Sequence, residues 1–208
     1  VISRWHRYIV LRPDGFIIRL VLMIGGTVAM KRESLAAIAE SLAAKHIVGE
    51  KTNRDYMKML KYYPENDPDE FKNGWCCAFV YHCCREAGIN LPLGTHKTAR
   101  KGNFRWFTGV IAWFEWGQVN GFIHYESPDF APEKGDIVIF NNIVPEQYKQ
   151  KGSLWCDHIG IVLSCKGEYL TVAEGNVDNQ NVSGIMKRKL DETIGCYIRI
   201  PEDYESDE

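Results

Sequence analysis

Apolar residues in the first half of the chain recur every three or four positions, as on one face of an amphipathic helix. One such stripe lies between residues 32 and 47. A second follows Asn53, a residue type that often caps a helix N-terminus. Together they predict a helical lead-in over residues 30–72.

A third and more apolar helix is predicted over residues 73–88. Asn73 is a suitable N-cap, and Gly88 suits the position just past a helix end, where a left-handed backbone is common. Between them only His82 and the Arg85-Glu86 pair make a polar stripe, and the remaining positions are mostly aromatic, aliphatic or cysteine. We therefore expect this helix to be buried.

Beyond residue 131, short β-branched and aromatic runs alternate with turn signals, a pattern typical of antiparallel strands. Five runs fit this pattern: 136–140, 158–163, 168–173, 184–190 and 196–200. They predict an antiparallel sheet of about five strands within residues 132–201. Because the helices precede the strands and do not alternate with them, the pattern indicates an α+β fold.

Residues 102–130, between the apolar helix and the predicted sheet, form an insertion rich in aromatic residues. Buried rings of a helical insertion are the more ordinary interpretation, since each buried ring removes a large apolar area from water. The alternative is a cleft wall that stacks on a substrate. In that case Trp113 and Trp116 are candidate substrate contacts.

Composition favours one domain, which we place at residues 30–201. The chain has 208 residues, of which 45% are hydrophobic, enough for one sizeable core. A formal net charge of −2 gives no nucleic-acid signature. Residues 1–29 carry four Arg and one Asp, a net charge of +3, and the five acidic residues of 202–208 account for the whole charge of −5 on the remainder. We expect this acidic tail to be a solvated end.

Residues 1–29 differ from the rest of the chain, and we assign no helix or strand to them. Their apolar run, 16–24, is interrupted by an arginine and is shorter than the roughly twenty residues that span a membrane. It also lacks the unbroken core of a secretory signal. Ile-Gly-Gly at 24–26 is what a bacterial ribosome-binding sequence would spell as codons shortly before Met30. We predict an untranslated leader or a disordered N-terminal segment.

The seven cysteines are an odd number, and two pairs, 76–77 and 83–84, are adjacent. Disulfide frameworks are typical of small secreted domains, so we expect reduced thiols here. A zinc site built from Cys156, His158 and the paired cysteines is an alternative. It lacks the two Cys-x-x-Cys knuckles of common structural zinc sites, and we expect no metal and no other cofactor.

Cys76 has the position of a nucleophile. It lies in the first turn of the predicted buried helix, where unpaired backbone N–H groups and the positive dipole end favour a thiolate. A thiolate needs a base for its proton and a group that orients the base. His158 begins one predicted strand and Glu174 ends the next, so the three residues form a chemically complete set.

Four motifs occur here in one order. They are Trp75-Cys76, Pro132-x-x-Gly135-Asp136-Ile137-Val138, Asp157-His158-Ile159-Gly160 and Glu174-Gly175-Asn176. Over residues 34–201 the chain resembles the CHAP family of cysteine/histidine-dependent amidohydrolases and peptidases, relatives of NlpC-type cell-wall peptidases. The resemblance implies a papain-like α+β fold, with N-terminal helices and a buried nucleophile helix packed on the sheet.

The resemblance also assigns residues. It implies Cys76 as the nucleophile, His158 as the base, Glu174 as its orienting partner and Asn176 as a further polar member of the site. We expect substrate contacts from Trp75, Trp113, Trp116 and Asp157. Two departures from the family pattern are the second cysteine, Cys77, and the long aromatic insertion.

A protein of this kind is expected to hydrolyse an amide bond in the peptide stem of peptidoglycan, as an N-acetylmuramoyl-L-alanine amidase or an endopeptidase. The alternatives are a cysteine-dependent toxin, effector or deamidase that acts on protein, and a zinc-stabilised binding module without catalysis. For the preferred function the partner is the bacterial cell wall, with no nucleic acid or membrane, and the protein is a monomer. We expect it to stay in the cytoplasm until it is released to the wall, as a phage endolysin is.

Overall fold

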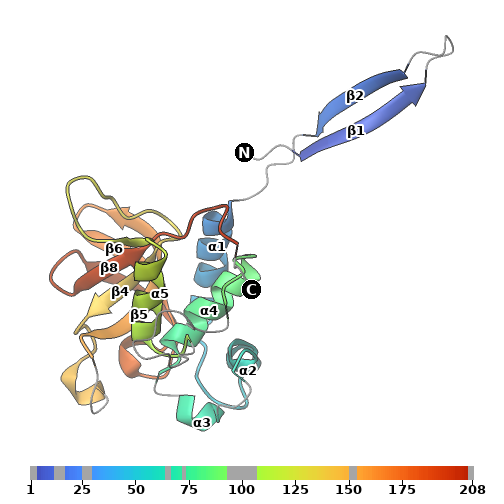
Figure 1. Cartoon of the computed structure of the whole chain (residues 1–208). Helices are drawn as coiled ribbons and strands as arrows, with labels where there is room; N and C mark the ends of the chain where they lie inside the picture. Colours follow the sequence, from blue (N-terminus) through green and yellow to red (C-terminus); the bar gives the residue numbers. More distant parts are fainter. Residues whose placement is uncertain are drawn as a thin grey trace. The chain divides into compact units, whose positions relative to one another are not determined.

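The computed structural model describes residues 4–11, 17–24, 30–63, 67–71, 74–92, 107–149 and 154–205 (Figure 1). The chain divides into two compact units, Val1–Met30 and Lys31–Glu208. The first contains two antiparallel strands, β1 (Arg4–Leu11) and β2 (Ile17–Ile24). The sequence did not suggest this hairpin, and the leader assignment of residues 1–29 stays a prediction.

The helices of the larger unit are α1 (Lys31–Ala43), α2 (Arg54–Leu60), α3 (Pro68–Phe71), α4 (Cys76–Glu86) and α5 (Val110–Val119). The expected cap of α2 is confirmed, because the Asn53 side chain accepts hydrogen bonds from the backbone N–H groups of Asp55 and Tyr56 at 3.0 and 3.2 Å. Within the described residues, no helix has the length and apolar character needed to cross a bilayer.

Helix α4 is the buried helix that the sequence predicts. It begins at Cys76 with Trp75 in the N-cap position, and Asn73, the expected cap, lies outside the described residues. Gly88 follows the helix end with a φ of +76°, as expected for a residue that terminates a helix in a left-handed turn. The first nine residues of α4 are buried, including His82 of the predicted polar stripe.

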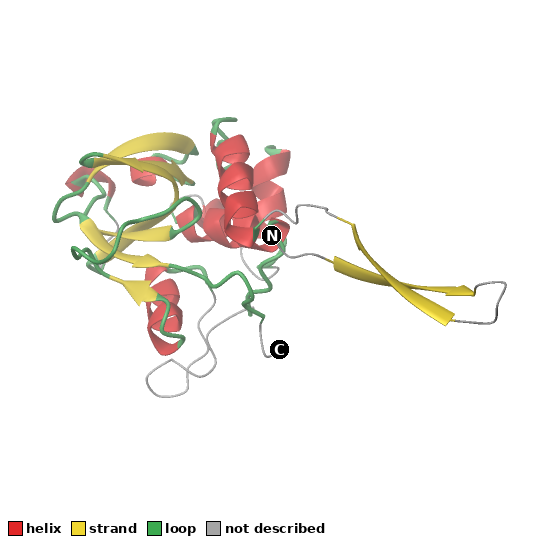
Figure 2. Ribbon diagram, turned by 90° about the horizontal axis from the view of Figure 1, so that it is seen from above, coloured by secondary structure: helices red, strands yellow, loops and turns green. Residues whose placement is uncertain are grey.

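The strands of the larger unit are β3 (Ile123–His124), β4 (Ile137–Asn141), β5 (Cys156–Lys166), β6 (Tyr169–Glu174), β7 (Gly184–Lys189) and β8 (Ile194–Ile198). They form one antiparallel sheet in the order β3-β8-β4-β5-β6-β7. The five predicted runs correspond to β4–β8, and β3 is too short to give a sequence pattern. Figure 2 shows the strands gathered into one layer with helices outside it, so the predicted papain-like α+β fold is confirmed.

Helix α4 lies against the middle of this sheet. It contacts β5 and β6, and α1 and α2 flank it. Its buried side chains, such as Phe79, join those of α1 and the sheet in one hydrophobic core. Since β5 runs antiparallel to β6, the start of β5 and the end of β6 meet at the same edge, close to the first turn of α4.

The aromatic insertion belongs to the core, which corrects one prediction. Trp113 of α5 is fully buried and Trp116 is 4% exposed, with ring centroids 6.1 Å apart. Phe107 packs on Trp113 at 4.7 Å. Rings buried this deeply in the core have no face open for a ligand to stack on, so the substrate contacts expected from Trp113 and Trp116 are wrong. Residues 102–106 lie outside the described part of the insertion.

The acidic tail is also more ordered than expected. Glu202 accepts hydrogen bonds from the backbone N–H of Lys31 at 2.6 Å and from Nε of Arg32 at 3.1 Å, at the first turn of α1. Tyr204 packs its ring against Trp116 with centroids 5.7 Å apart. Residues 202–205 are therefore part of the domain and not a solvated end.

The Gly-Asp motif that precedes β4 is structural. Asp136 is fully buried, and its carboxylate accepts hydrogen bonds from Nε and Nη2 of Arg199 at 2.9 and 2.7 Å. It also lies 3.4 Å from Nη1 of Arg32 on α1. This buried carboxylate joins the start of β4, the end of β8 and α1, which fixes the position of α1 against the sheet.

Candidate active site

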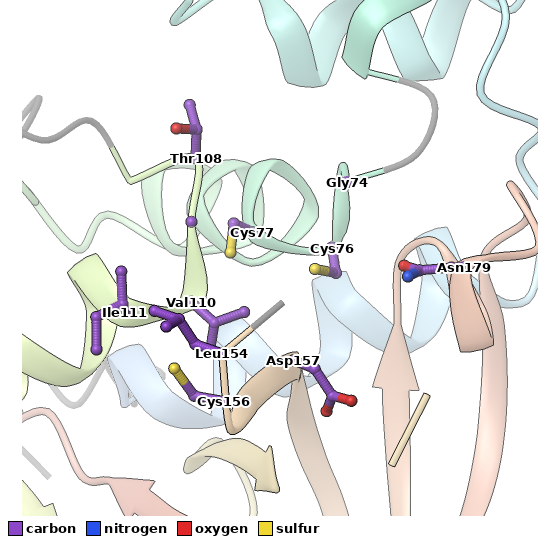
Figure 3. A pocket seen from close by; sticks show the side chains of 11 residues that line it. Gly74, Cys76, Cys77, Thr108, Val110, Ile111, Leu154, Cys156, Asp157 and Asn179 are labelled. Atoms are coloured by element: carbon purple, nitrogen blue, oxygen red, sulfur yellow. The ribbon is translucent and has the colours of Figure 1, made fainter. Parts of the chain in front are cut away.

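Cys76 opens helix α4 and lines a pocket of about 220 Å³ (Figure 3). The N-cap residue, Trp75, makes no side-chain hydrogen bond to the helix. The first-turn backbone N–H groups therefore have no side-chain cap, and the positive end of the helix dipole lies at the thiol. The local environment is the one expected for a reactive thiolate.

His158 and Glu174 lie beside this turn on adjacent strands, β5 and β6, and both are fully buried. Nε2 of His158 is 2.9 Å from Oε2 of Glu174. The other ring nitrogen, Nδ1, is buried and has no hydrogen-bond partner among the described residues. Because the carboxylate accepts a hydrogen bond from Nε2–H, Nδ1 is the nitrogen left to exchange a proton with Cys76.

The electrostatics of these residues favour an ion pair. The hydrogen bond with Cys77, followed by the contact with His158, lowers the pKa of Cys76 to about 5, although burial opposes this shift. Burial acts to lower the pKa of His158, but the charge of Glu174 and the contact with Cys76 outweigh it and raise the pKa to about 10. At neutral pH a thiolate and an imidazolium face each other.

Cys77 lines the same pocket but is a different kind of thiol. Burial raises its pKa well above the ordinary value, and the neighbouring Cys76 adds to this shift. Successive residues on a helix point about 100° apart, so one thiol faces the imidazole while the other does not. The structure leaves Cys77 protonated, as a hydrogen-bonding neighbour of the Cys76 sulfur.

Two motif glycines allow the close packing around the site. A Cβ on Gly160 of β5 would lie 2.9 Å from Cγ of Glu174, and a Cβ on Gly175 would lie 2.4 Å from Cβ of Phe79 on α4. Either side chain would push the strands away from each other or from the helix. These glycines therefore hold Glu174 near His158 and hold β6 near α4.

Arg188 of β7 is a site residue that the sequence did not reveal. Its Nε and Nη2 donate to Oε1 and Oε2 of Glu174 at 2.8 and 2.6 Å. Burial acts to raise the pKa of Glu174, but the bonds from Arg188 and the charge of His158 outweigh it and lower the pKa. The available signal was a basic residue within a run that alternates between faces, but Lys187 and Lys189 are equally basic neighbours.

Asn176 has another role than the one expected. It is buried with a φ of +52°, its Nδ2 donates to Oδ1 of Asn179 at 3.0 Å, and its Oδ1 accepts from the backbone N–H of Asn181 at 2.9 Å. The amide thus stabilises the loop after β6 and is not bonded to His158. Asn179, not Asn176, lines the pocket.

The two remaining predicted contacts differ from each other. Asp157 lines the pocket, as expected, but its carboxylate already accepts the backbone N–H groups of Ile143 and Val144 at 3.0 and 3.2 Å. Trp75 is fully buried, and its Nε1 donates to Oδ1 of Asn181 at 3.1 Å. The substrate contact predicted for Trp75 is therefore wrong, because its ring is part of the core.

The opposite wall of the pocket is mostly apolar and comes from residues that the sequence did not assign to substrate binding. They are Val110 and Ile111 at the start of α5, Leu154, and Cys156 at the start of β5 (Figure 3). The seven cysteines are all free thiols. Within the described residues, no three or more His, Cys, Asp or Glu side chains gather in a way that could hold a metal ion.

The fold and the site together define an α+β domain in which an antiparallel sheet lies behind a thiol at the start of a buried helix. Residues 66–176, just over half of the chain, match the CHAP domain, and the chain belongs to this family. Members of this family are cysteine/histidine-dependent amidohydrolases and peptidases.

Comparison with solved structures gives one further similarity. The chain is 15% identical to the protein in "The crystal structure of Ly7917", with a TM-score of 0.38, over 81% of this chain and 61% of that one. The chain therefore spans about three fifths of the length of that structure. No curated protein matches the chain.

Proposed function

We propose that this protein hydrolyses an amide bond in the peptide part of bacterial peptidoglycan, with Cys76 as the nucleophile. The observation that carries this proposal is the arrangement of Cys76 at the start of α4, facing a buried His158–Glu174 pair and opening on a pocket. Family membership supports the reaction class. The arrangement supplies the nucleophile, base and orienting group that amide hydrolysis requires.

In the acylation step, the thiolate of Cys76 attacks the carbonyl carbon of the scissile amide. The imidazolium of His158 gives a proton from Nδ1 to the leaving amine, so the C–N bond breaks as a neutral amine departs. Glu174 accepts the Nε2–H throughout and stabilises the cation. The product of this step is an acyl-enzyme at Cys76 and a neutral imidazole.

In the deacylation step, the same imidazole takes a proton from a water molecule that attacks the thioester. The carboxylic acid leaves, and the thiolate–imidazolium pair forms again. In both steps negative charge develops on the carbonyl oxygen. The backbone N–H groups at the start of α4 are aimed at this position, and one such donor contributes on the order of 3 kcal/mol in other enzymes.

A non-catalytic module is the weaker alternative, because a lowered pKa of Cys76 and an unpartnered Nδ1 of His158 have no use in a binding domain. A toxin, effector or deamidase would use the same three residues on a protein substrate. Neither the pocket nor the family favours a protein substrate over the wall, so substrate tests decide between them.

The direct test is digestion of purified peptidoglycan by the full chain, followed by mass spectrometry of the soluble products. We expect fragments with new amino termini, or stems released from the sugar, and no new reducing ends. Cys76→Ser serves as the matched inactive control. Intact peptidoglycan after treatment with a folded, thiol-reactive protein would contradict the proposal and leave a protein substrate.

A further inference from the structure

Arg188 extends a chain of buried charges behind the candidate site. Its guanidinium binds both oxygens of Glu174, and its Nη2 also reaches Oδ1 of Asp178 at 2.8 Å. The Glu174 side chain has no exposed surface, and the Arg188 side chain is 10% exposed. A planar guanidinium matches a carboxylate in this two-bond geometry, which a lysine ammonium cannot reproduce.

Two cationic groups share one oxygen of this carboxylate. Oε2 of Glu174 receives Nε2 of His158 at 2.9 Å and Nη2 of Arg188 at 2.6 Å. A buried carboxylate that faced only an imidazolium could take its proton, which would leave a neutral acid beside a neutral ring. The guanidinium makes that transfer unfavourable, because it keeps its positive charge at every accessible pH.

The packing supports a role in orientation as well as in charge. The ring of Phe140 on β4 lies nearly parallel to the imidazole of His158, with centroids 6.0 Å apart and an angle of 25°. The guanidinium carbon of Arg188 lies 5.6 Å from the centroid of the same ring. One aromatic side chain therefore contacts both cations that bind Glu174.

We propose that Arg188 is a positioning residue that keeps Glu174 ionised, so that the proton between Glu174 and His158 stays on Nε2 and Nδ1 stays turned to Cys76. The inference rests on the proposed chemistry of Cys76 and His158. Glu174 is faced by His158 from β5 and Arg188 from β7, with Asp178 behind Arg188 and Cys76 beyond His158. Arg188 thus acts through Glu174 and not on the sulfur itself.

The test is the rate of iodoacetamide reaction at Cys76 as a function of pH, on the full chain and without any wall substrate. In Arg188→Met we expect the midpoint of thiolate formation to rise by about one pH unit or more, because a Glu174 that is no longer held ionised stabilises the imidazolium of His158, and so the thiolate, less well. Arg188→Lys keeps the charge and should keep the midpoint. Lys189→Met removes an exposed charge from the same strand and should leave the midpoint unchanged.

Two further measurements separate this role from a purely structural one: the kinetic constants of Arg188→Lys, and labelling in a Glu174→Gln background. Arg188→Lys should lower kcat with KM unchanged, since it loses the two-bond geometry. In Glu174→Gln, adding Arg188→Met should shift the midpoint no further. The proposal is overturned if Arg188→Met labels as the wild type does, if the shift persists in Glu174→Gln, or if Arg188→Lys keeps full kcat. Since labelling needs no peptidoglycan, a wrong substrate assignment would leave these results readable.

Discussion

At the scale of single residues, environment separates two adjacent cysteines of identical chemistry. Cys76 has the helix end and the imidazole of His158, whereas Cys77 is held in a buried position that penalises its charged form. Cys77 nevertheless contributes to the site, because its hydrogen bond is the largest of the effects that stabilise the Cys76 thiolate. An apparent departure from the family pattern thus has a physical use.

The first prediction concerns Cys77→Ala. Loss of the Cys77 hydrogen bond makes the Cys76 thiolate less stable, so the pKa of Cys76 should rise from about 5. The acid limb of the kcat/KM profile should move to higher pH, while the activity at about pH 8 stays within a few-fold of the wild type. Cys77→Ser keeps a hydrogen-bond donor and should restore much of the shift. A folded Cys77→Ala that is inactive at every pH would assign the nucleophile to Cys77.

The sequence was enough to predict which three residues the structure brings together at the site, but not the residue that supports them. Cys76, His158 and Glu174 could be predicted because their chemistry needs each residue type at one end of an element. Arg188 could not be predicted, since it lies in a Lys-Arg-Lys run and only the strand register shows which residue reaches Glu174. Asn176 was misassigned because a motif gives no information on where an amide points.

At the scale of the elements, periodicity predicted α4 and the strands β4–β8, whose apolar runs are long enough to read. It could not place β3, which has two residues, and it could not tell a buried ring from a ring in a cleft. Trp113 and Trp116 illustrate this limit, because aromatic density is the same in both cases. Only the packing of α5 shows that they are core.

The second prediction follows from that packing. Trp113→Ala should lower the free energy of unfolding by about 3–5 kcal/mol, because it leaves a cavity where a fully buried ring lay. Urea unfolding measures this loss, and the KM of the folded protein should not change. The partly exposed Trp155 provides a control of the same chemistry, and Trp155→Ala should cost much less. A stable Trp113→Ala with a raised KM would return this ring to the substrate cleft.

At the scale of the whole larger unit, the last described residues contact the first turn of α1, where this unit begins. Glu202 and Glu205 bind Lys31 and Arg32 at the start of α1, although about 170 residues separate them in the sequence. Net charge alone suggested a solvated tail, since a count of charges does not show where their partners lie. The acidic residues at 202 and 205 therefore stabilise the first turn of α1, where the sequence suggested only a solvated end.

The third prediction tests this contact. Glu202→Ala removes the group that accepts the first N–H of α1, and it should cost about 1 kcal/mol of unfolding free energy, as loss of a helix cap does. Asp203→Ala removes the same charge from an exposed neighbouring position and should cost little. Thermal unfolding of both variants measures the difference. Equal melting temperatures for the two would show that the tail contributes no cap.

The claim on which the whole account depends is that the Cys76 thiol, activated by His158, is the reactive group. The measurement is iodoacetamide labelling of the full chain at about pH 6, with the modified residue located by peptide mass spectrometry and the lost activity followed in parallel. We predict that the label falls on Cys76, that activity falls in proportion, and that His158→Ala reacts far more slowly at this pH. Labelling of Cys77 in place of Cys76, or activity that survives complete modification of Cys76, would contradict the account.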